Sequence, residues 1–257
     1  MIKMDMLGPT QFWYGDRMLD LPPLERVIHM ALRVCGGTMS MTKLAEAVWG
    51  SPTGGSPSTL RGCLSRARAK VVAAGGTPEQ LTRTQRLSGG QTLVSLADGW
   101  DVDADRFRCH AIAASAAYQS GQFGEARAQV DAALELWYED PLPDAGGRPF
   151  AVRYIKELEG IHWSASLTGI KADICLGGHR EVVAGLQHLT KSRPGEGEVW
   201  MLLATALYRS DRVPEAAEVC KRAITIRRGK GIEARRLQEL QHAMLAEAPT
   251  PVGPLGW

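Results

Sequence analysis

The chain has 257 residues, of which 44% are hydrophobic and 23% charged, a composition typical of globular proteins. Its length fits two domains better than one, and no apolar run is long enough to cross a membrane. The first six residues include charged side chains where a signal peptide would need an apolar stretch. Five widely spaced cysteines form neither a disulfide framework nor a metal-binding pattern. These features predict a cytoplasmic protein with reduced thiols and no membrane partner.

Charge is distributed unevenly along the chain. Residues 1–98 contain eleven Lys and Arg against seven Asp and Glu, whereas residues 99–257 contain nineteen against twenty-one. Within residues 51–90 there are six basic residues and a single acidic one, Glu79. A local basic patch on a nearly neutral chain is typical of a surface that faces phosphate. A solvated cationic face unrelated to binding explains the charge alone equally well.

Residues 1–98 show the pattern of a small α+β domain. The first 21 residues alternate between apolar and polar side chains, which indicates short antiparallel strands. Helical spacing of apolar residues then indicates three helices, and a further alternating stretch indicates a two-stranded hairpin. The helices are expected between residues 24 and 36, between Ser40 and Gly50, and from an N-cap at Ser56 to Gly75, and the hairpin between residues 81 and 96. This order is that of a winged helix-turn-helix of the response-regulator type, whose third helix enters the DNA major groove.

The third predicted helix carries most of the candidate DNA-binding residues. Its apolar face consists of Leu60, Leu64, Ala67 and Val71, with Cys63 beside them. The opposite face is formed by small residues with basic residues on either side, so the helix can approach DNA closely while arginines reach phosphate or guanine. The candidate residues are Ser58, Thr59, Arg61, Ser65, Arg66, Arg68 and Lys70 in this helix and Arg83 and Arg86 in the hairpin. Arg61, Ser65 and Arg66 are expected to contact bases, whereas solvent or an acidic neighbour is almost as good a prediction for Arg68 and Lys70.

Residues 99–248 are predicted to form an all-α domain, followed by a Pro- and Gly-rich tail at residues 249–257. Residues 177–182 align with residues 211–216 at an offset of 34, and residues 118–126 align with residues 208–216 at an offset of 90. A period of 34 with small residues between paired helices is typical of tetratricopeptide repeats, which stack and leave a surface for partners. The alternative is an ordinary helical domain whose turns are similar by chance.

No catalytic or cofactor motif occurs in the sequence. The nucleotide-binding glycine patterns, the zinc-protease H-E-x-x-H, C-x-x-C and the G-x-S-x-G nucleophile motif are all absent. The six histidines are scattered and never spaced as a pair of metal ligands. The sequence therefore predicts no catalytic residue, no metal site and no cofactor, and an enzyme is the least favoured class of function.

A series of short motifs along nearly the whole chain resembles a family of bacterial regulators. The motifs occupy residues 44–50, 58–60, 65–68, 81–84, 102–107, 133–137, 149–151 and 206–210. Their order and spacing are similar to those of the Streptomyces antibiotic regulatory protein family. In that family a winged-helix DNA-binding domain precedes a bacterial transcriptional activator domain, which the resemblance places here at residues 1–98 and 99–248.

The resemblance implies a sequence-specific transcriptional activator of a secondary-metabolite (antibiotic) gene cluster. Such a protein would bind direct repeats in double-stranded promoter DNA, recruit RNA polymerase holoenzyme, act as a homodimer or as a pair assembled on DNA, and be associated with the nucleoid. The chain departs from the family pattern at three places, and the first two of them motivate an alternative. Glu25 stands where the first helix usually has a basic or amide residue, Gln91 follows Gly90 where the wing usually has an aromatic, and Gly62 within the third helix costs about 1 kcal/mol relative to Ala. The second hypothesis is therefore a protein-interaction or ligand-sensing regulator with a degenerate winged helix.

Overall fold

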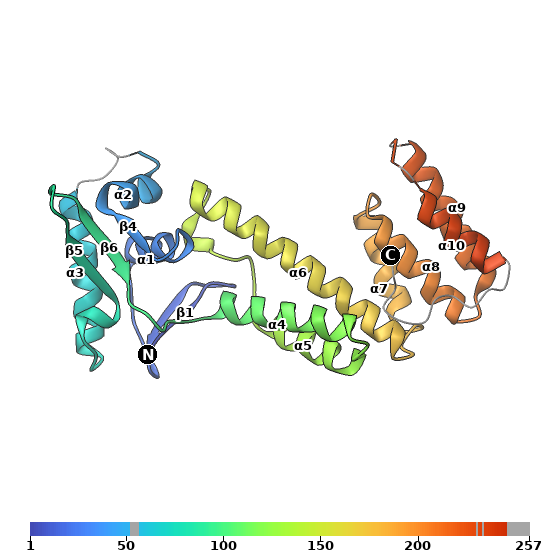
Figure 1. Ribbon diagram of the computed structural model, residues 1–257, viewed down its shortest axis with the longest axis horizontal. Helices are drawn as coiled ribbons and strands as arrows, with labels where there is room; N and C mark the ends of the chain where they lie inside the picture. The colour runs from blue at the N-terminus through green and yellow to red at the C-terminus, as the bar shows by residue number, and fades with distance from the viewer. Residues whose placement is uncertain (52–56, 230, 233, 246–257) are drawn as a thin grey trace. The chain divides into compact units, whose positions relative to one another are not determined.

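The computed structural model describes residues 1–51, 57–229, 231–232 and 234–245 (Figure 1). The chain divides into two compact units. Unit 1 consists of Met1–Cys109 and Ala133–His162, and unit 2 consists of His110–Ala132 and the chain from Trp163 onward. Two features expected from the sequence, the N-cap at Ser56 and the tail at residues 249–257, lie outside the described residues.

Two small sheets form the β part of unit 1. The first has four strands in the order β3-β2-β1-β7, in which β1 pairs antiparallel with β2 and parallel with β7. The second has three antiparallel strands in the order β4-β6-β5. The strands are Ile2–Asp5 (β1), Gln11–Tyr14 (β2), Arg17–Met18 (β3), Thr38–Ser40 (β4), Thr82–Arg86 (β5), Thr92–Leu96 (β6) and Asp101–Val102 (β7). The strands predicted at the N-terminus and the hairpin of β5 and β6 are confirmed, whereas β4 and β7 are too short to show alternation in the sequence.

The three helices predicted in the N-terminal region are confirmed as Pro23–Val34 (α1), Met41–Trp49 (α2) and Pro57–Ala73 (α3), and short 3₁₀ helices lie at Pro78–Gln80 (η1) and Pro143–Ala145 (η2). Ser40 caps α2, because its hydroxyl accepts a hydrogen bond from the backbone nitrogen of Lys43 at 3.3 Å. Gly50 ends α2 with a φ of 74°, in the left-handed region that favours glycine. The residues of α3 predicted to face the core are all buried, namely Leu60, Cys63, Leu64, Ala67 and Val71.

The core of unit 1 extends beyond the boundary predicted at residue 98. Its buried cluster combines the N-terminal strands and helices with residues of Asp103–Gln119 (α4), Phe123–Glu135 (α5) and Pro149–Cys175 (α6), each of which spans both units. Phe107 and Leu158 are fully buried within this cluster. The division into residues 1–98 and 99–248 therefore differs from the units that packing defines, because apolar side chains beyond residue 98 complete the N-terminal core.

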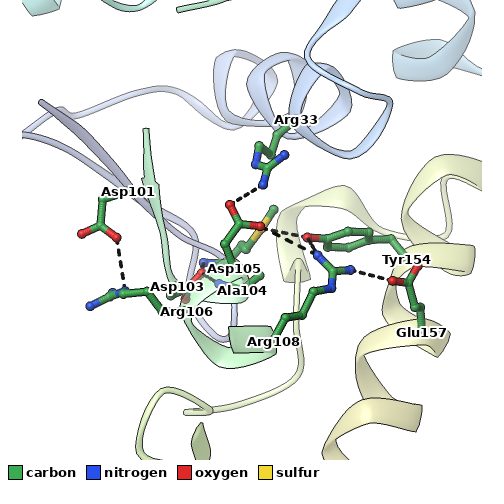
Figure 2. Close-up of polar contacts among 10 residues, drawn as sticks. Arg33, Asp101, Asp103, Ala104, Asp105, Arg106, Arg108, Tyr154 and Glu157 are labelled. Atoms are coloured by element: carbon green, nitrogen blue, oxygen red, sulfur yellow. Dashed lines mark hydrogen bonds and ion pairs between the residues drawn. The ribbon is translucent and has the colours of Figure 1, made fainter. Parts of the chain in front are cut away.

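A buried carboxylate at the start of α4 connects this helix to the end of β1 (Figure 2). Asp103, which is 5% exposed, accepts hydrogen bonds from the backbone nitrogens of Met6 and Leu7 at 2.9 Å and of Ala104 at 2.7 Å. Burial raises the pKa of Asp103 to about 6, and the hydrogen bonds from Leu7 and Met6 oppose that shift. The carboxylate thus satisfies backbone groups that would otherwise be buried without a partner.

Further polar contacts join α1, α4 and α6 around this carboxylate (Figure 2). The side chain of Arg108 donates to the Tyr154 hydroxyl and to the Glu157 carboxylate, both at 2.9 Å. Two further ion pairs link Arg33 to Asp105 and Arg106 to Asp101. These contacts and the carboxylate of Asp103 bring the start of α4 into the N-terminal fold.

His29 occupies the interior of unit 1 as a neutral ring. It is fully buried, its Nδ1 lies 2.7 Å from the carbonyl oxygen of Glu25, and its ring stacks on Trp100 and meets the edge of Phe12. Burial is the main cause that lowers the pKa of His29 to about 4. The ring therefore serves as a packed core side chain, and its protonation would place a charge among apolar neighbours.

Unit 2 is helical in its described part and contains, besides parts of α4, α5 and α6, the helices Val182–Ser192 (α7), Gly197–Arg209 (α8), Val213–Gly229 (α9) and Arg235–Leu245 (α10). α8 packs against α7 and α9, and α10 packs against both α8 and α9. The central position of α8 explains why its residues from Val199 to Leu207 are all buried. No helix within the described ranges is both long and apolar enough to cross a membrane.

The three aligned sequence segments form turns of the same backbone geometry. Each turn places a residue of positive φ after a helix: Gly121 (74°), Gly177 (94°) and Asp211 (61°). In each turn this residue's amide donates to the carbonyl three residues earlier, and the next amide donates to the carbonyl five residues before it. This pair of hydrogen bonds is the Schellman motif that ends helices. The correspondence predicted at offsets of 34 and 90 residues therefore holds for these turns.

We predict that Asp103→Ala destabilises the protein by at least about 2 kcal/mol at pH 7.5, because buried amides then lose their acceptor. Chemical denaturation followed by circular dichroism measures this difference. Asp140→Ala is the matched control, since Asp140 is an exposed aspartate. An equal stability of the two variants would contradict the role given to Asp103.

A second prediction concerns His29 and acid. Its pKa in the fold, about 4, lies below the unfolded value of about 6.5, so its contribution to stability is present above pH 6.5 and is lost as the pH falls toward 4. Denaturation curves between pH 4.5 and 7.5, compared with those of His29→Gln, isolate this contribution from that of Asp103. The wild type should lose up to about 1.4 kcal/mol per pH unit relative to the variant; parallel curves would contradict the prediction.

Candidate nucleic-acid interface

The exposed side of α3 is the centre of the candidate interface. Packing of its apolar face leaves Arg61, Ser65, Arg66 and Ala69 exposed. Ser58 and Thr59, at the start of the helix, are exposed as well. Neither α3 nor the hairpin strands β5 and β6 contains an acidic residue. The surface is therefore positively charged, and the side chains between its arginines are small, so the helix can approach phosphate closely.

Arg68 connects α3 to the hairpin. Its Nε donates to the Thr82 hydroxyl at 2.9 Å, and its Nη2 donates to the Thr84 hydroxyl at 2.5 Å. Burial lowers the pKa of Arg68, as expected for a cation partly removed from water. Solvent or an acidic neighbour was the alternative prediction for Arg68. Its hydrogen bonds are made to two threonine hydroxyls of β5, and the negative charge of Glu79 also acts on it. This arginine positions the hairpin beside α3.

A cleft between α3 and the hairpin brings predicted residues together. It is lined by Met41, Arg61, Leu64, Arg68, Thr84, Arg86, Gly90 and Thr92. Three of the candidate arginines thus line one concave surface, and two of them, Arg61 and Arg86, are exposed. The sequence placed Arg61 and Arg86 in separate elements, so only the pairing of α3 with the hairpin explains their proximity.

The remaining candidate cations have intramolecular partners. Lys70 donates to the backbone carbonyl of Asp20. Arg83 lies 3.5 Å from Asp98, but both side chains are largely exposed, so this pair adds little to stability. The Nε of Arg66 donates to Glu25 at 2.8 Å, and the Glu25 side chain is only 1% exposed.

Glu25, Thr82 and Thr84 contact the candidate arginines but were not among the residues predicted for the site. A signal for Glu25 was present, since it lies on the same stripe of α1 as Ile28 and Leu32, and an acid on an apolar stripe requires a partner. No comparable signal marked the two threonines, because β-strands often carry threonine. Their role depends on which helix lies beside the strand.

Comparison with known proteins identifies the family. The model of the bacterial transcriptional activator domain family matches residues 102–245. The chain is 30% identical to the regulatory protein AfsR of Streptomyces griseus, in a match that covers 85% of this chain and 22% of AfsR. It is 31% identical to AfsR of Streptomyces coelicolor, over 96% of this chain and 24% of AfsR.

A second group of relatives comes from mycobacteria. The transcriptional regulatory protein EmbR of Mycobacterium tuberculosis is 27% identical over 86% of this chain and 56% of EmbR. The solved structure of M. tuberculosis EmbR in complex with a low affinity phosphopeptide has a TM-score of 0.82 and 24% identity, covering 98% of this chain and 66% of that one. This likeness shows a common fold, although the chain spans only part of each of these proteins. Because the family model matches more than half of the chain, the chain belongs to the bacterial transcriptional activator domain family, and it is similar to the Streptomyces antibiotic regulatory proteins.

Proposed function

We propose that this protein is a DNA-binding transcriptional activator. In this proposal, α1 to α3 with the β5–β6 hairpin act as a winged helix-turn-helix, and the helical residues that follow form a tetratricopeptide-like activator domain. The names of the relatives AfsR and EmbR, both regulatory proteins, support this class of function. The same family supports a non-enzymatic role.

The observation that carries the proposal is the arginine-lined cleft between α3 and the hairpin. Arg61, Arg68 and Arg86 line it without an acidic neighbour among its lining residues. Arginine on a concave surface beside an exposed helix suits the phosphates that flank a major groove. Arg61 was expected from the sequence to contact bases, but it lines the cleft together with Arg86, so we infer that both neutralise phosphate. Ser65 and Arg66, on the exposed face of α3, are proposed to contact base edges.

The finer parts of the proposal follow from family resemblance. The operator would consist of direct repeats in a promoter, bound by a homodimer or by a pair assembled on DNA. The helical domain would offer the surface that recruits RNA polymerase holoenzyme, and the regulated genes would be those of a secondary-metabolite (antibiotic) cluster. The protein would act in the cytoplasm at the nucleoid.

A second candidate function is a regulator whose degenerate winged helix contacts protein or a ligand instead of DNA. It is favoured by one observation, namely that Arg66, Arg68 and Lys70 all have intramolecular partners and are less free to meet phosphate. Such a protein would bind DNA without sequence preference and with little dependence on salt.

We predict that the double variant Arg61→Ala/Arg86→Ala binds DNA at least about tenfold more weakly and that the slope of log K against log salt falls by about two units, one for each lost phosphate contact. Fluorescence anisotropy at several salt concentrations, with a duplex from the region upstream of the gene's own cluster and with scrambled duplexes, measures both. Arg153→Ala, an exposed arginine of α6, is the control for loss of charge.

Two outcomes would count against the DNA-binding proposal. The first is a wild-type protein that shows neither sequence preference nor a salt slope, which would favour the protein-interaction hypothesis. The second is an Arg61→Ala/Arg86→Ala variant that behaves like Arg153→Ala, which would show that the cleft does not face DNA.

A further prediction tests the arrangement on direct repeats. If two copies bind one side of the duplex, inserting about 5 base pairs, half a helical turn, between the repeats should abolish cooperative binding. Inserting about 10 base pairs should restore it, since this returns both half-sites to the same side. Gel-shift titration separates the singly and doubly bound species, and cooperativity unaffected by the half-turn insertion would contradict the arrangement.

A further inference from the structure

Glu25 and Arg66 form an ion pair in which the two side chains differ sharply in exposure. The carboxylate of Glu25 in α1 is 1% exposed, whereas the side chain of Arg66 in α3 is 62% exposed. The Nε of Arg66 donates to Oε1 of Glu25 at 2.8 Å. The other oxygen of Glu25 is buried without a hydrogen-bond partner among the described residues. A buried carboxylate is costly unless it is paired, so Glu25 favours conformations in which Arg66 stays beside it.

Two further contacts hold the guanidinium of Arg66. Its Nη2 donates to the sulfur of Cys63 at 3.2 Å. Its Nη1 lies against Gly62, where a Cβ atom would be only 3.3 Å away. The glycine therefore leaves space for the guanidinium to lie along the helix, and this space gives a reason for a residue that is unfavourable within a helix. Arg66 is therefore held by Glu25 of α1 and by Cys63 in the preceding turn of α3.

These contacts leave part of the guanidinium available. Arginine has five N–H donors in a rigid plane. Glu25 and Cys63 accept from Nε and Nη2, so three of the five N–H donors have no partner among the residues that the structure describes. An arginine that is already fixed loses less conformational freedom when it binds, so its contribution to recognition increases.

We propose that Glu25 is a positioning residue for DNA recognition, which fixes Arg66 so that the free edge of its guanidinium contacts a base in the major groove. This role rests on the proposed DNA-binding function. The acid that departs from the family pattern at the start of α1 and the glycine within α3 then serve one purpose, because both determine where the guanidinium of Arg66 lies.

The test is a selection of preferred sequences from a pool of random-sequence duplexes, followed by affinity measurements on the selected duplex and on a scrambled one. The proteins compared are the full-length wild type, Glu25→Gln, Arg66→Met and the double variant. Glu25→Gln should fold, because it removes a buried charge and leaves only an exposed arginine unpaired. Thermal melting checks this. Asp105→Asn is the control, since it removes the carboxylate partner of another α1 residue, Arg33, without touching α3.

For Glu25→Gln we expect about a tenfold loss of affinity for the selected duplex and a loss of preference at a guanine position, with binding to scrambled DNA changed little. In the Arg66→Met background, Glu25→Gln should cause no further loss of affinity or sequence preference, because it acts through Arg66. It should raise the melting temperature there, because it removes a buried carboxylate that has lost its partner. Asp105→Asn should keep the wild-type sequence preference.

Four results would overturn the proposal. Unchanged preference in Glu25→Gln would show that Glu25 does not position Arg66 for recognition, and tighter binding would show that it withholds Arg66 from DNA. An equal loss in the Arg66→Met background, or the same loss in Asp105→Asn, would assign the effect to general stability. A wild type that selects no sequence would instead contradict the proposed DNA-binding function. This result is obtained before any variant is compared.

Discussion

Burial of one face of α3 is the constraint on which the candidate interface depends. Leu60 and Val71, at opposite ends of this face, are fully buried, and α1 and α2 both pack against the helix. Each such side chain contributes about 1.5–3 kcal/mol on burial, whereas an exposed ion pair contributes about 0–1 kcal/mol. Packing therefore decides the rotation of α3 about its axis. The arginines take the positions that remain, which is why a cationic surface forms on the opposite side.

A second constraint is the satisfaction of buried backbone amides. Met6 and Leu7 follow β1, and the carboxylate of Asp103 accepts hydrogen bonds from their backbone amides. The strand and the start of α4 are thereby held together, although about a hundred residues separate them in sequence. The N-terminal fold consequently extends into helices that the sequence had placed in a second domain. Loss of the Asp103 carboxylate would therefore affect both the segment that follows β1 and the start of α4.

The arginines of the candidate interface differ in what they do, although they share a residue type and a predicted role. Arg68 joins α3 to the hairpin through Thr82 and Thr84. Arg66 is held by a buried acid, and Arg61 remains exposed at the cleft. In the proposed function, an arginine such as Arg68 would support DNA binding without contacting DNA, by fixing the elements that are proposed to contact it. Loss of affinity in an arginine variant has to be compared with the stability of the fold before a contact is assigned.

Local patterns in the sequence determined the helices and strands of the N-terminal region, the buried face of α3 and the equivalent turns at Gly121, Gly177 and Asp211. These features depend on periodicity and on the preference of particular residues for caps and turns, which a single chain displays. Motif order also indicated the family. The limits of the compact units were decided by tertiary packing, because the residues that complete a core are chosen by proximity in space. The partners of Arg66 and Arg68 were decided in the same way, since the sequence shows charge and spacing but not which buried acid or strand hydroxyl lies within reach.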